Sequence, residues 1–285
     1  MERIRAFELK NKGLFVVRLR VKNSDGASIT SGNILSGKSL IIDLNQHLDK
    51  INDGDTVWVE AVVVGGKNRT SSKKYIYRAG ALEKAKYEIK GLPMSNNLKF
   101  IGTETAYEYH FFYDEDNPHK INGITYVLIP EESIAIVHPN GYEYEGTVKI
   151  PSTIKYQGKK YVVTEIGKTA FYCCQELKSL TLPASICYIS DFIVKDCDML
   201  TTIRVQTDTP PEVEAHGFQE FNKDKCTLYV PLGCTEIYRN TYYWDQFKNI
   251  KAYWNKPIID RINKDILKIR GVKNLRIKPE QPQKE

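Results

Sequence analysis

The sequence predicts a mostly β protein, in which an N-terminal antiparallel β-sandwich precedes a short solenoid of repeats and a helical tail. Three observations support this prediction. Short alternating apolar segments fill residues 5–102, two later segments repeat one apolar pattern, and isoleucines near the C-terminus recur at helical spacing. The length of 285 residues is enough for two domains, each with its own core.

The segment GLFVVRLRV at residues 13–21 shows the strand pattern most clearly. Phe15, Val17, Leu19 and Val21 fall on one face, and basic residues fall on the other. SLIIDL, TVWVEAVVV, KYIYRA, KYEI and NLKFI follow, separated by turns rich in Gly, Asn and Asp. Strands at this spacing predict a sandwich over residues 1–102, in which the best helix candidate, around 45–50, is only a turn or two.

Residues 103–120 form a predicted connector. Tyr107, Tyr109, Phe111 and Tyr113 alternate along it, and the acidic, turn-rich stretch DEDNPHK follows. Two interpretations are open. The segment is either an extended linker that contains the domain boundary, or the first strand of the second domain.

Residues 166–182 and 189–205 carry the same apolar pattern. A period in the twenties with an L-x-x-L-x-L core is the signature of a leucine-rich-repeat solenoid, whose coils must stack because none can bury its apolar edge alone. We predict such a solenoid over residues 121–255, with an imperfect earlier coil around 150–154 and a last strand at 227–231. At an offset of 23 positions the aligned pairs are Ile166 and Ile189, Cys174 and Cys197, Leu177 and Leu200, Leu180 and Ile203, and Leu182 and Val205.

The C-terminal segment 256–285 is basic. Nine Lys and Arg against four Asp and Glu give it +5 of the net charge of +6. Ile258, Ile262, Ile266 and Ile269 have helical spacing, and the final residues KPEQPQKE are expected to be disordered. No aromatic residue is interleaved with these charges, so we interpret the segment as a solvated helix rather than a nucleic-acid-binding arm.

The repeat segments resemble one known family. GITYVLI and YEGTVKIPSTIKYQGKKYVVTEIGKTAFYCC are followed in order by LKSLTLPASICYIS, the pair Pro210-Pro211, and CTLYVPLGCTEIYRN with WDQFKNI. This order of motifs closely resembles BspA-like leucine-rich-repeat proteins, from which the second repeat differs by carrying Ile193-Val194 in place of the usual Ala-Phe. The N-terminal domain looks like the small β-sandwich modules that are fused to bacterial surface proteins.

The resemblance implies a bacterial protein of the cell surface, or a secreted one, that serves in adhesion and binding rather than catalysis. The expected partner is a protein or glycan on a host or neighbouring cell surface. No signal peptide is visible, so the chain is either cytoplasmic or a mature form whose export signal was removed. No segment approaches the roughly 18 apolar residues of a membrane-spanning helix, and no nucleic-acid partner is expected.

Candidate binding residues follow from the geometry of the coils. Within each repeat strand, the residue between the last two apolar positions should point away from the core, and neighbouring strands lie about 4.8 Å apart. Two interpretations are open for the resulting ladder, which is either a recognition strip or the solvated side of a sheet. Its members are Lys149, Thr181, Arg204 and Tyr229, with Ser179 and Thr202 on the same face.

Gly32–Ser39 matches the phosphate-binding pattern G-x-x-x-x-G-K-[ST] letter for letter. Phosphate binding requires a buried strand before the first glycine and a helix after the final serine. The lead-in contains a single apolar residue larger than Ala, and the exit SLIIDL is a better strand than helix. We therefore predict a β-turn with a solvent-facing Lys38, and a nucleotide-dependent enzyme remains only as an alternative.

A second alternative is a carbohydrate-binding module in the N-terminal sandwich, with loops that carry Trp58 and Arg69. Arg69 lies in the basic segment 65–74, which we interpret as a solvated hairpin tip. The aromatic residues between 238 and 254 have two interpretations as well, a binding patch and the favoured one, a cap that seals the last coil. They are Tyr238, Tyr242, Tyr243, Trp244, Phe247, Tyr253 and Trp254.

No motif in the sequence argues for catalysis. The five histidines, at 47, 110, 119, 138 and 216, are scattered and lack the spacing of a metal or nucleophile motif. The six cysteines lie between residues 173 and 234 without zinc-site spacing. We therefore expect free thiols, no metal, no cofactor and no enzymatic activity.

Overall fold

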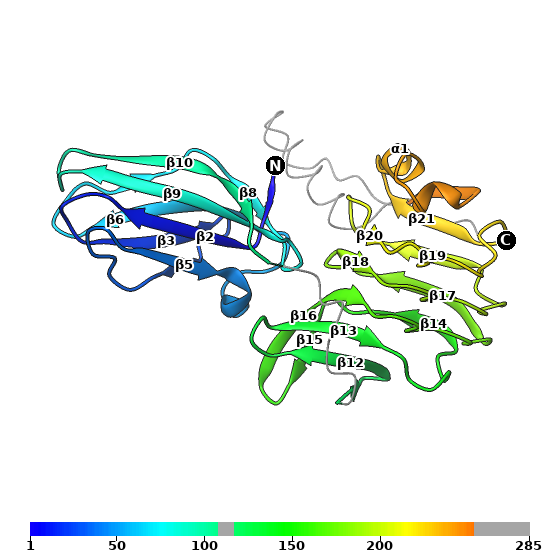
Figure 1. Ribbon diagram of the computed structural model, residues 1–285. Coiled ribbons are helices and arrows are strands. Elements are labelled where there is room, and N and C mark those ends of the chain that lie inside the picture. The colour runs from blue at the N-terminus through cyan, green and yellow to red at the C-terminus, as the bar shows by residue number, and fades with distance from the viewer. Residues whose placement is uncertain (108–116, 254–285) are drawn as a thin grey trace, which may run out of the picture. The chain divides into compact units, whose positions relative to one another are not determined.

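The computed structural model describes residues 1–107 and 117–253 (Figure 1). These residues form 22 β-strands, one α-helix and two 3₁₀-helices, so the prediction of a mostly β protein is confirmed. The predicted helical tail at 256–285 lies outside the described part, as do Trp254 and most of the alternating residues of the predicted connector. No helix within the described part is long and apolar enough to cross a membrane.

The chain divides into two compact units. The first comprises Met1–His138, Ser152–Gly167 and Ser185–Tyr188. The second comprises Pro139–Pro151, Lys168–Ala184 and Ile189–Glu285. The repeat region therefore contributes to both units, because the chain alternates between them along its length. The boundaries expected from the sequence, at 102 and 121, stay a prediction.

Two β-sheets form the N-terminal part of the first unit. One has the order β1 (Arg3–Ile4), β8 (Tyr75–Tyr77), β6 (Thr56–Val63), β3 (Val17–Asn23) and β4 (Ser28–Thr30), with β7 (Arg69–Thr70) beside β6. The other has the order β10 (Asn96–Thr105), β9 (Glu83–Gly91), β2 (Ala6–Asn11) and β5 (Ser39–Asp43). The predicted purely antiparallel pairing is wrong at two places, because β1 pairs parallel with β8 and β2 pairs parallel with β9. A parallel pair needs a long crossover between its strands, which the chain between β2 and β9 provides.

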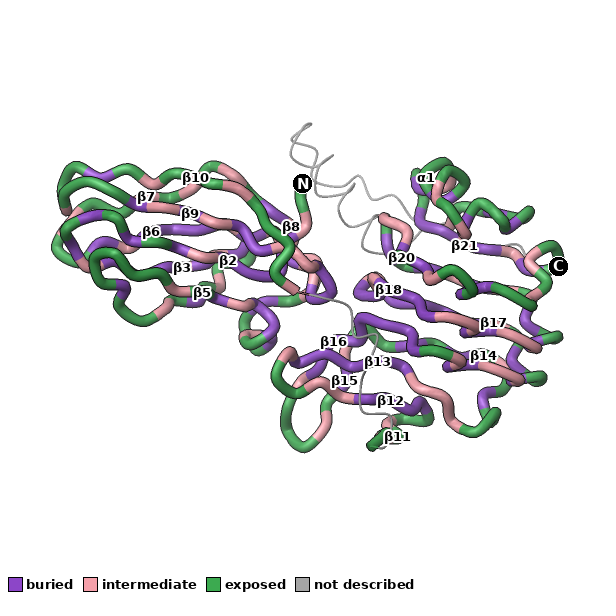
Figure 2. Tube along the Cα trace, viewed as in Figure 1, coloured by how far each residue is buried: buried purple, intermediate pink, exposed green. Residues whose placement is uncertain are grey.

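Residues from both sheets share one hydrophobic core (Figure 2). The alternation predicted for β3 is confirmed, because Val17, Leu19 and Val21 are buried while Arg18 is exposed. Tyr75 and Tyr87 also lie in this core, and their hydroxyl groups are 3.1 Å apart, so each satisfies the other within an apolar environment. Alternation with period two thus places one face of each strand in the core.

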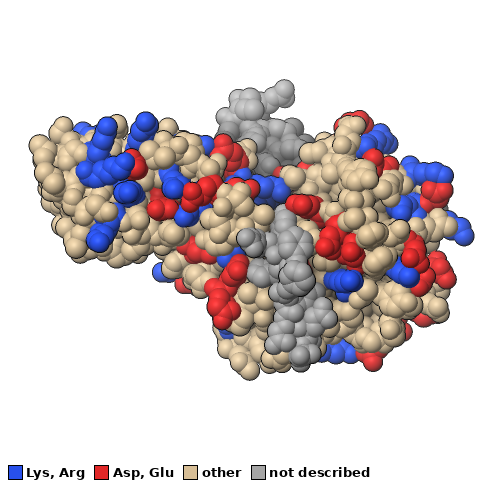
Figure 3. Space-filling model, in the orientation of Figure 1, with Lys and Arg blue, Asp and Glu red and all other residues tan. Residues whose placement is uncertain are grey.

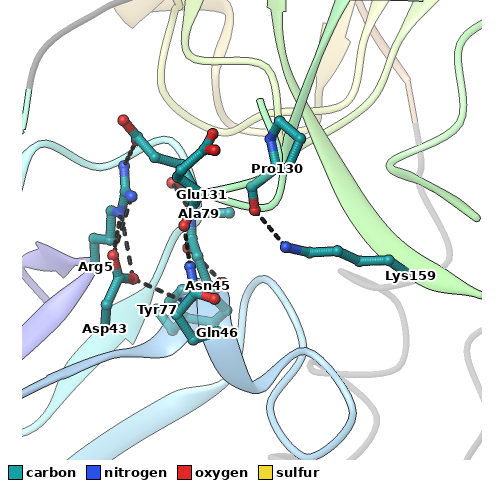
Figure 4. Close-up of polar contacts among 10 residues, drawn as sticks. Arg5, Asp43, Asn45, Gln46, Tyr77, Ala79, Pro130, Glu131 and Lys159 are labelled. Carbon is teal, nitrogen blue, oxygen red and sulfur yellow. Dashed lines mark hydrogen bonds and ion pairs between the residues drawn. The ribbon is translucent and has the colours of Figure 1, made fainter. Parts of the chain in front are cut away.

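A polar network surrounds the buried guanidinium group of Arg5 (Figure 4). Arg5 donates hydrogen bonds to both carboxylate oxygens of Asp43, at 3.0 to 3.3 Å, and to Glu132 at 2.6 Å. Asp43 also accepts a hydrogen bond from the backbone N–H of Asn45 and thereby caps the 3₁₀-helix η1 (Leu44–His47). The helix expected around 45–50 is therefore present as this single turn.

The pKa of Arg5 shows how the network compensates for burial. Burial alone would lower that pKa, but the carboxylates of Asp43 and Glu132 outweigh it and raise the pKa above the ordinary value. The side chain also stacks on the ring of Tyr107, 3.7 Å from its centroid. A buried charge is tolerated only with such partners, so Arg5 holds the start of β2, η1 and the turn that contains Glu132 in one arrangement.

A third sheet contains seven strands. Its strands follow the order β11 (His119–Ile121), β12 (Ile124–Ile129), β13 (Ile134–His138), β16 (Lys159–Ile166), β18 (Tyr188–Ile189) and β20 (Glu212–Val213), with β15 (Thr153–Tyr156) beside β16. Strand β10 continues to Thr105, and β11 begins at His119, so both enter the predicted connector at 103–120. Part of that connector is therefore strand.

The second unit contains one sheet in which all neighbouring strands are parallel. Its order is β14 (Gly146–Lys149), β17 (Leu177–Leu182), β19 (Thr202–Val205), β21 (Thr227–Pro231) and β22 (Asn249–Tyr253). The predicted repeat alignment is confirmed here, because Leu180 pairs with Ile203 and Leu182 with Val205, and all four are buried. Short strands that each pair with the next coil bury apolar slots that a single coil would leave exposed.

The turns between these strands repeat as well. The N–H groups of Thr169, Phe171 and Cys173 donate to the carbonyl groups of Asp191, Ile193 and Lys195 in the next coil. Thr169 and Phe192 both have positive φ angles, of 55° and 56°, although neither is glycine. Hydrogen bonds between successive turns hold these residues in the left-handed conformation, which L-residues otherwise avoid.

The aromatic segment at the end of the repeats packs as a cap. It contains the helix α1 (Thr235–Arg239) and the 3₁₀-helix η2 (Trp244–Gln246). Tyr238, Trp244 and Phe247 are buried, and Phe218 makes edge-on contacts with both Trp244 and Phe247. The indole N–H of Trp244 donates to the carbonyl of Pro211 at 2.9 Å. These contacts agree with the capping interpretation for these three residues, whereas Tyr242 is 70% exposed.

Replacing Trp244 with Ala should lower the free energy of unfolding by about 3–5 kcal/mol, because the change removes a fully buried ring and leaves a cavity. Denaturant unfolding followed by circular dichroism measures the change. Tyr242→Ala is the matched control and should stay within about 0.5 kcal/mol of the wild type. Equal effects of the two substitutions would contradict the cap.

Candidate binding surface

The parallel sheet of the second unit arranges its outward side chains in two rows. The first row consists of Thr147, Ser179, Thr202, Thr227 and Asn249. The second row consists of Lys149, Thr181, Arg204, Tyr229 and Lys251. We call these two rows the ladder face. The six residues predicted from the sequence all lie on it, in the register expected from the repeat.

The residues of the ladder face differ in how far they are exposed. Lys149 and Lys251 are exposed, and Arg204 and Tyr229 are half-buried. The expectation of exposure is wrong for Thr181, which is only 8% exposed. Thr181 is a short side chain between the longer side chains of Lys149 and Arg204 in the same row, so its neighbours shield it.

Arg204 is held by two aromatic rings. Its guanidinium carbon lies 5.2 Å from the ring centroid of Tyr229 and 4.5 Å from that of Tyr253. The hydroxyl group of Tyr253 donates to the carbonyl of Val205 at 3.0 Å, which fixes the position of that ring. A guanidinium group that stacks on rings keeps its N–H edge available for an anion, so Arg204 is oriented before any ligand arrives.

The sheet that carries the ladder face has a one-sided charge. Its five strands contain Lys149, Lys178, Arg204 and Lys251 but no Asp or Glu. None of these four side chains forms an ion pair within the described residues. Other basic residues of the unit do find partners, as in the pair of Lys195 with Glu220 at 2.8 Å. The three unpaired charges on the ladder face itself, those of Lys149, Arg204 and Lys251, make it attractive to anionic groups.

The first row of the ladder face supplies uncharged polar groups. The hydroxyl groups of Thr147, Ser179, Thr202 and Thr227 have no hydrogen-bond partner among residues 1–107 and 117–253. Asn249 is different, because its amide donates to the carbonyl of Asp224 at 3.0 Å. Hydroxyl groups both donate and accept, so a row of them accommodates either side chains or sugar hydroxyls.

Sequence reasoning missed the fifth strand and its contribution to the ladder face. Asn249, Lys251 and Tyr253 were grouped with the capping segment, whereas the structure places them on β22 beside β21. One signal in the sequence indicates the strand. In NIKAY, Ile250 occupies the apolar slot that Leu228 occupies in the preceding strand, and the two residues pair.

The predicted turn and strand at Gly32–Ser39 are confirmed. Lys38 is exposed, and residues from Ser39 onward form strand β5 where a phosphate site would need a helix. The backbone N–H of Gly37 donates to the carbonyl of Asn11, so this amide is already used within the fold. The segment therefore joins two strands and has a different local structure from a phosphate-binding loop.

The expectation that loops carry the residues proposed for a sugar site is wrong, because Trp58 lies in β6 and Arg69 in β7. Arg69 donates through Nε to the side chain of Asn96 at 3.0 Å. The ammonium group of Lys74 lies 4.9 Å from the ring centroid of Trp58. Strands β6 and β7 pair on either side of 64–68, so the hairpin tip predicted at 65–74 is present only in its first part, and Arg69 and Thr70 belong to β7.

A separate cavity of about 380 Å³ lies in the first unit. His119 stacks on Tyr156 at its wall, with ring centroids 4.4 Å apart, and Tyr161 also lines it. No group of three or more His, Cys, Asp or Glu that could hold a metal ion is found in the described part of the chain. The cavity was not predicted from the sequence, because its lining comes from four separate strands and the turns beside them.

All six cysteines are free thiols. Cys174 and Cys197, which share one repeat slot, are both buried, as the alignment predicts. Burial raises the pKa of Cys197 to about 12 and that of Cys226 to about 12. Such thiols are poor nucleophiles, so their role in the coils is packing.

Comparisons with known proteins agree with the repeat. Residues 147–278 match the model of the BspA-type leucine-rich repeat region, in six copies. Among curated proteins, no match to the sequence was found.

Three solved structures are similar to parts of this chain. A leucine-rich repeat protein from Bacteroides capillosus is 16% identical with a TM-score of 0.35, and the match covers 48% of this chain and 98% of that protein. A leucine-rich cell surface protein from Faecalibacterium prausnitzii is 15% identical with a TM-score of 0.34, covering 49% and 44% respectively. A protein from Eubacterium rectale is 15% identical with a TM-score of 0.25, covering 34% and 86%.

The thiols provide a test of the coil interior. At pH 8, iodoacetamide should leave Cys197 and Cys226 of the folded protein largely unmodified. A pKa near 12 lowers the fraction of thiolate by about three orders of magnitude relative to an ordinary cysteine. Peptide mass spectrometry measures labelling, with the half-buried Cys173 as the internal comparison and guanidinium-denatured protein as the positive control. Rapid labelling of Cys197 in the folded state would contradict the packing of the coils.

Proposed function

Because residues 147–278 belong to the BspA-type leucine-rich repeat family, we propose that this chain is a binding protein and that the ladder face is its recognition surface. The observation that carries this proposal is the register of the sheet, which brings unpaired basic side chains and free hydroxyl groups together from five separate segments. A surface of this composition attracts ligands, while a merely solvated sheet usually mixes both signs of charge.

Recognition would work through complementarity to a rigid surface. Parallel strands fix each row at intervals of about 4.8 Å, so a partner meets a regular series of donors. Arg204 is already oriented by Tyr229 and Tyr253, which reduces the side-chain entropy lost on binding. Lys149 and Lys251 are free to follow the shape of the partner.

The composition of the ladder face narrows the partner to one that presents anionic groups. A protein or a glycan on a host or neighbouring cell surface meets this description, in keeping with a location of this chain at the cell surface or outside the cell. Three unpaired basic residues on the ladder face, with Lys178 on the same sheet, favour rapid association and predict that raised ionic strength weakens binding.

The domain arrangement belongs to the same proposal. We assign residues 1–102 to a sandwich-type module that acts as a spacer or second recognition module, 103–120 to a connector and 121–255 to a short leucine-rich solenoid. A non-catalytic role is supported by the family and by the strand that follows Gly32–Ser39. The geometry offers no comparable support for a nucleotide-dependent enzyme.

The substitution Arg204→Ala with Lys251→Ala should weaken binding by about tenfold or more, because it removes two charged contacts from the centre and edge of the ladder face. A glycan array and a host-surface extract identify a ligand for the full chain, and biolayer interferometry then measures the affinity of the variant. Arg204→Ala with Tyr229→Ala tests the stacked arginine in the same way.

Lys168→Ala with Lys225→Ala is the matched control, since both lysines are exposed in the second unit but lie outside the sheet. This control removes the same charge and should bind as the wild type does. Unchanged binding by the ladder variant, or an equal loss in the control, would overturn the ladder face as the site.

A further inference from the structure

Four loops of the first unit meet at one end of the two N-terminal sheets. They are residues 12–16, 31–38, 64–68 and 92–95, and we call them the loop tip. Strands β2, β6 and β9 all run toward this end (Figure 1). Every loop contributes at least one large apolar side chain that is 49% to 80% exposed, and these are Leu14, Leu35, Val64, Leu92 and Met94.

Backbone hydrogen bonds join these loops to one another and to the end of β2. The N–H of Gly37 donates to the carbonyl of Asn11, that of Val64 to Val16, and that of Lys67 to Pro93. The side chain of Asn11 also donates to the carbonyl of Ile34 at 3.0 Å. The exposed apolar side chains therefore stand on loops that hydrogen bonds hold at one end of the module.

Two of the loops pack so closely that one position requires glycine. A Cβ atom on Gly66 would lie 2.3 Å from the carbonyl oxygen of Pro93, so only glycine fits there. Leu92 and Ser95 exchange two backbone hydrogen bonds, of 2.9 and 3.0 Å, which close the turn that presents Met94. Loops that are already fixed lose little conformational entropy when their exposed apolar side chains become buried in an apolar environment.

The charge of the loop tip is one-sided as well. The four loops contain no Asp or Glu. Lys38 and Lys67 within them and Lys90 beside them are exposed, and none of these three forms an ion pair within residues 1–107 and 117–253. The remaining lysine of the loops, Lys12, pairs with Glu88 of β9 at 2.7 Å. In the view of Figure 3, basic side chains outnumber acidic ones over this end of the first unit.

Aliphatic side chains beside unpaired lysines match the boundary region of an anionic bilayer. Apolar side chains enter the layer between headgroups and acyl chains, while lysines reach the phosphate groups. A glycan would favour exposed rings, and all five exposed apolar side chains of the loop tip are aliphatic. An acidic protein groove would satisfy the lysines but has no need for apolar side chains on four separate loops.

The geometry points to a second function, in which the loop tip docks the protein peripherally on an anionic phospholipid surface. Leu14, Leu92 and Met94 insert, and Lys38, Lys67 and Lys90 contact the headgroups. The site lies in the first unit and the ladder face in the second, so this inference stands whether or not the ladder face binds a ligand.

Co-sedimentation of the full chain with vesicles tests the inference. The protein should pellet with vesicles of phosphatidylserine and phosphatidylcholine and remain in the supernatant with phosphatidylcholine alone, and salt should weaken the association. Leu14→Asp with Met94→Asp should reduce the partition coefficient by at least about tenfold, since it removes the inserting groups and adds repelling charge. Lys38→Gln, Lys67→Gln and Lys90→Gln together should have a similar effect.

Ile41→Asp is the matched control, because Ile41 is 47% exposed in the middle of β5 and should leave vesicle binding unchanged. Thermal unfolding verifies that each variant is folded, and Arg204→Ala should bind vesicles as the wild type does. Absence of binding to anionic vesicles, or binding that Leu14→Asp with Met94→Asp does not alter, would overturn the inference. A change of oligomeric state in that variant would instead indicate that the loop tip contacts a second copy of the chain.

Discussion

Parallel pairing between short strands of successive coils is the interaction on which the second unit depends. Each strand has only four to six residues, too few to be stable alone, and each buries its apolar slots only beside the next. Because side chains alternate along a strand, the register that buries Leu180 beside Ile203 also places Thr181 beside Arg204 on the opposite face. The same strand register therefore determines both the buried interior of the coils and the arrangement of the ladder face.

The repeat pattern predicted this register because it contains the slots that must align. It did not predict the burial of Thr181. The face to which a side chain points follows from its position in the strand, but its exposure also depends on the length of the neighbouring side chains. It also missed β22. The coil before this strand is filled with aromatic residues that pack as a cap, and this composition obscured the short alternation in NIKAY. A cap and a last strand occupy the same stretch of sequence, which residue type alone does not separate.

In the first unit, local alternation predicted the strands but not their partners. Strand β2 pairs with β9 across most of the module, and such pairing is decided by topology rather than by any feature of either segment. The loop tip has the same origin. Leu14, Leu35 and Leu92 lie far apart in sequence and look like scattered apolar residues, which are common in loops. The strand order brings their loops to the same end of the module. The absence of Asp and Glu from the four loops then means that one surface region lacks acidic residues.

The two surfaces are both basic, yet the chain outside its tail is almost neutral, because most of the net charge of +6 belongs to residues 256–285. Acidic residues are therefore abundant but excluded from these particular strands and loops. What distinguishes the surfaces is their uncharged part, which is hydroxyl groups on the ladder face and aliphatic side chains on the loop tip. Salt screens the charges of both surfaces, but it does not weaken the contribution of the aliphatic side chains of the loop tip to binding. Ionic strength should therefore separate the two modes of binding within one molecule.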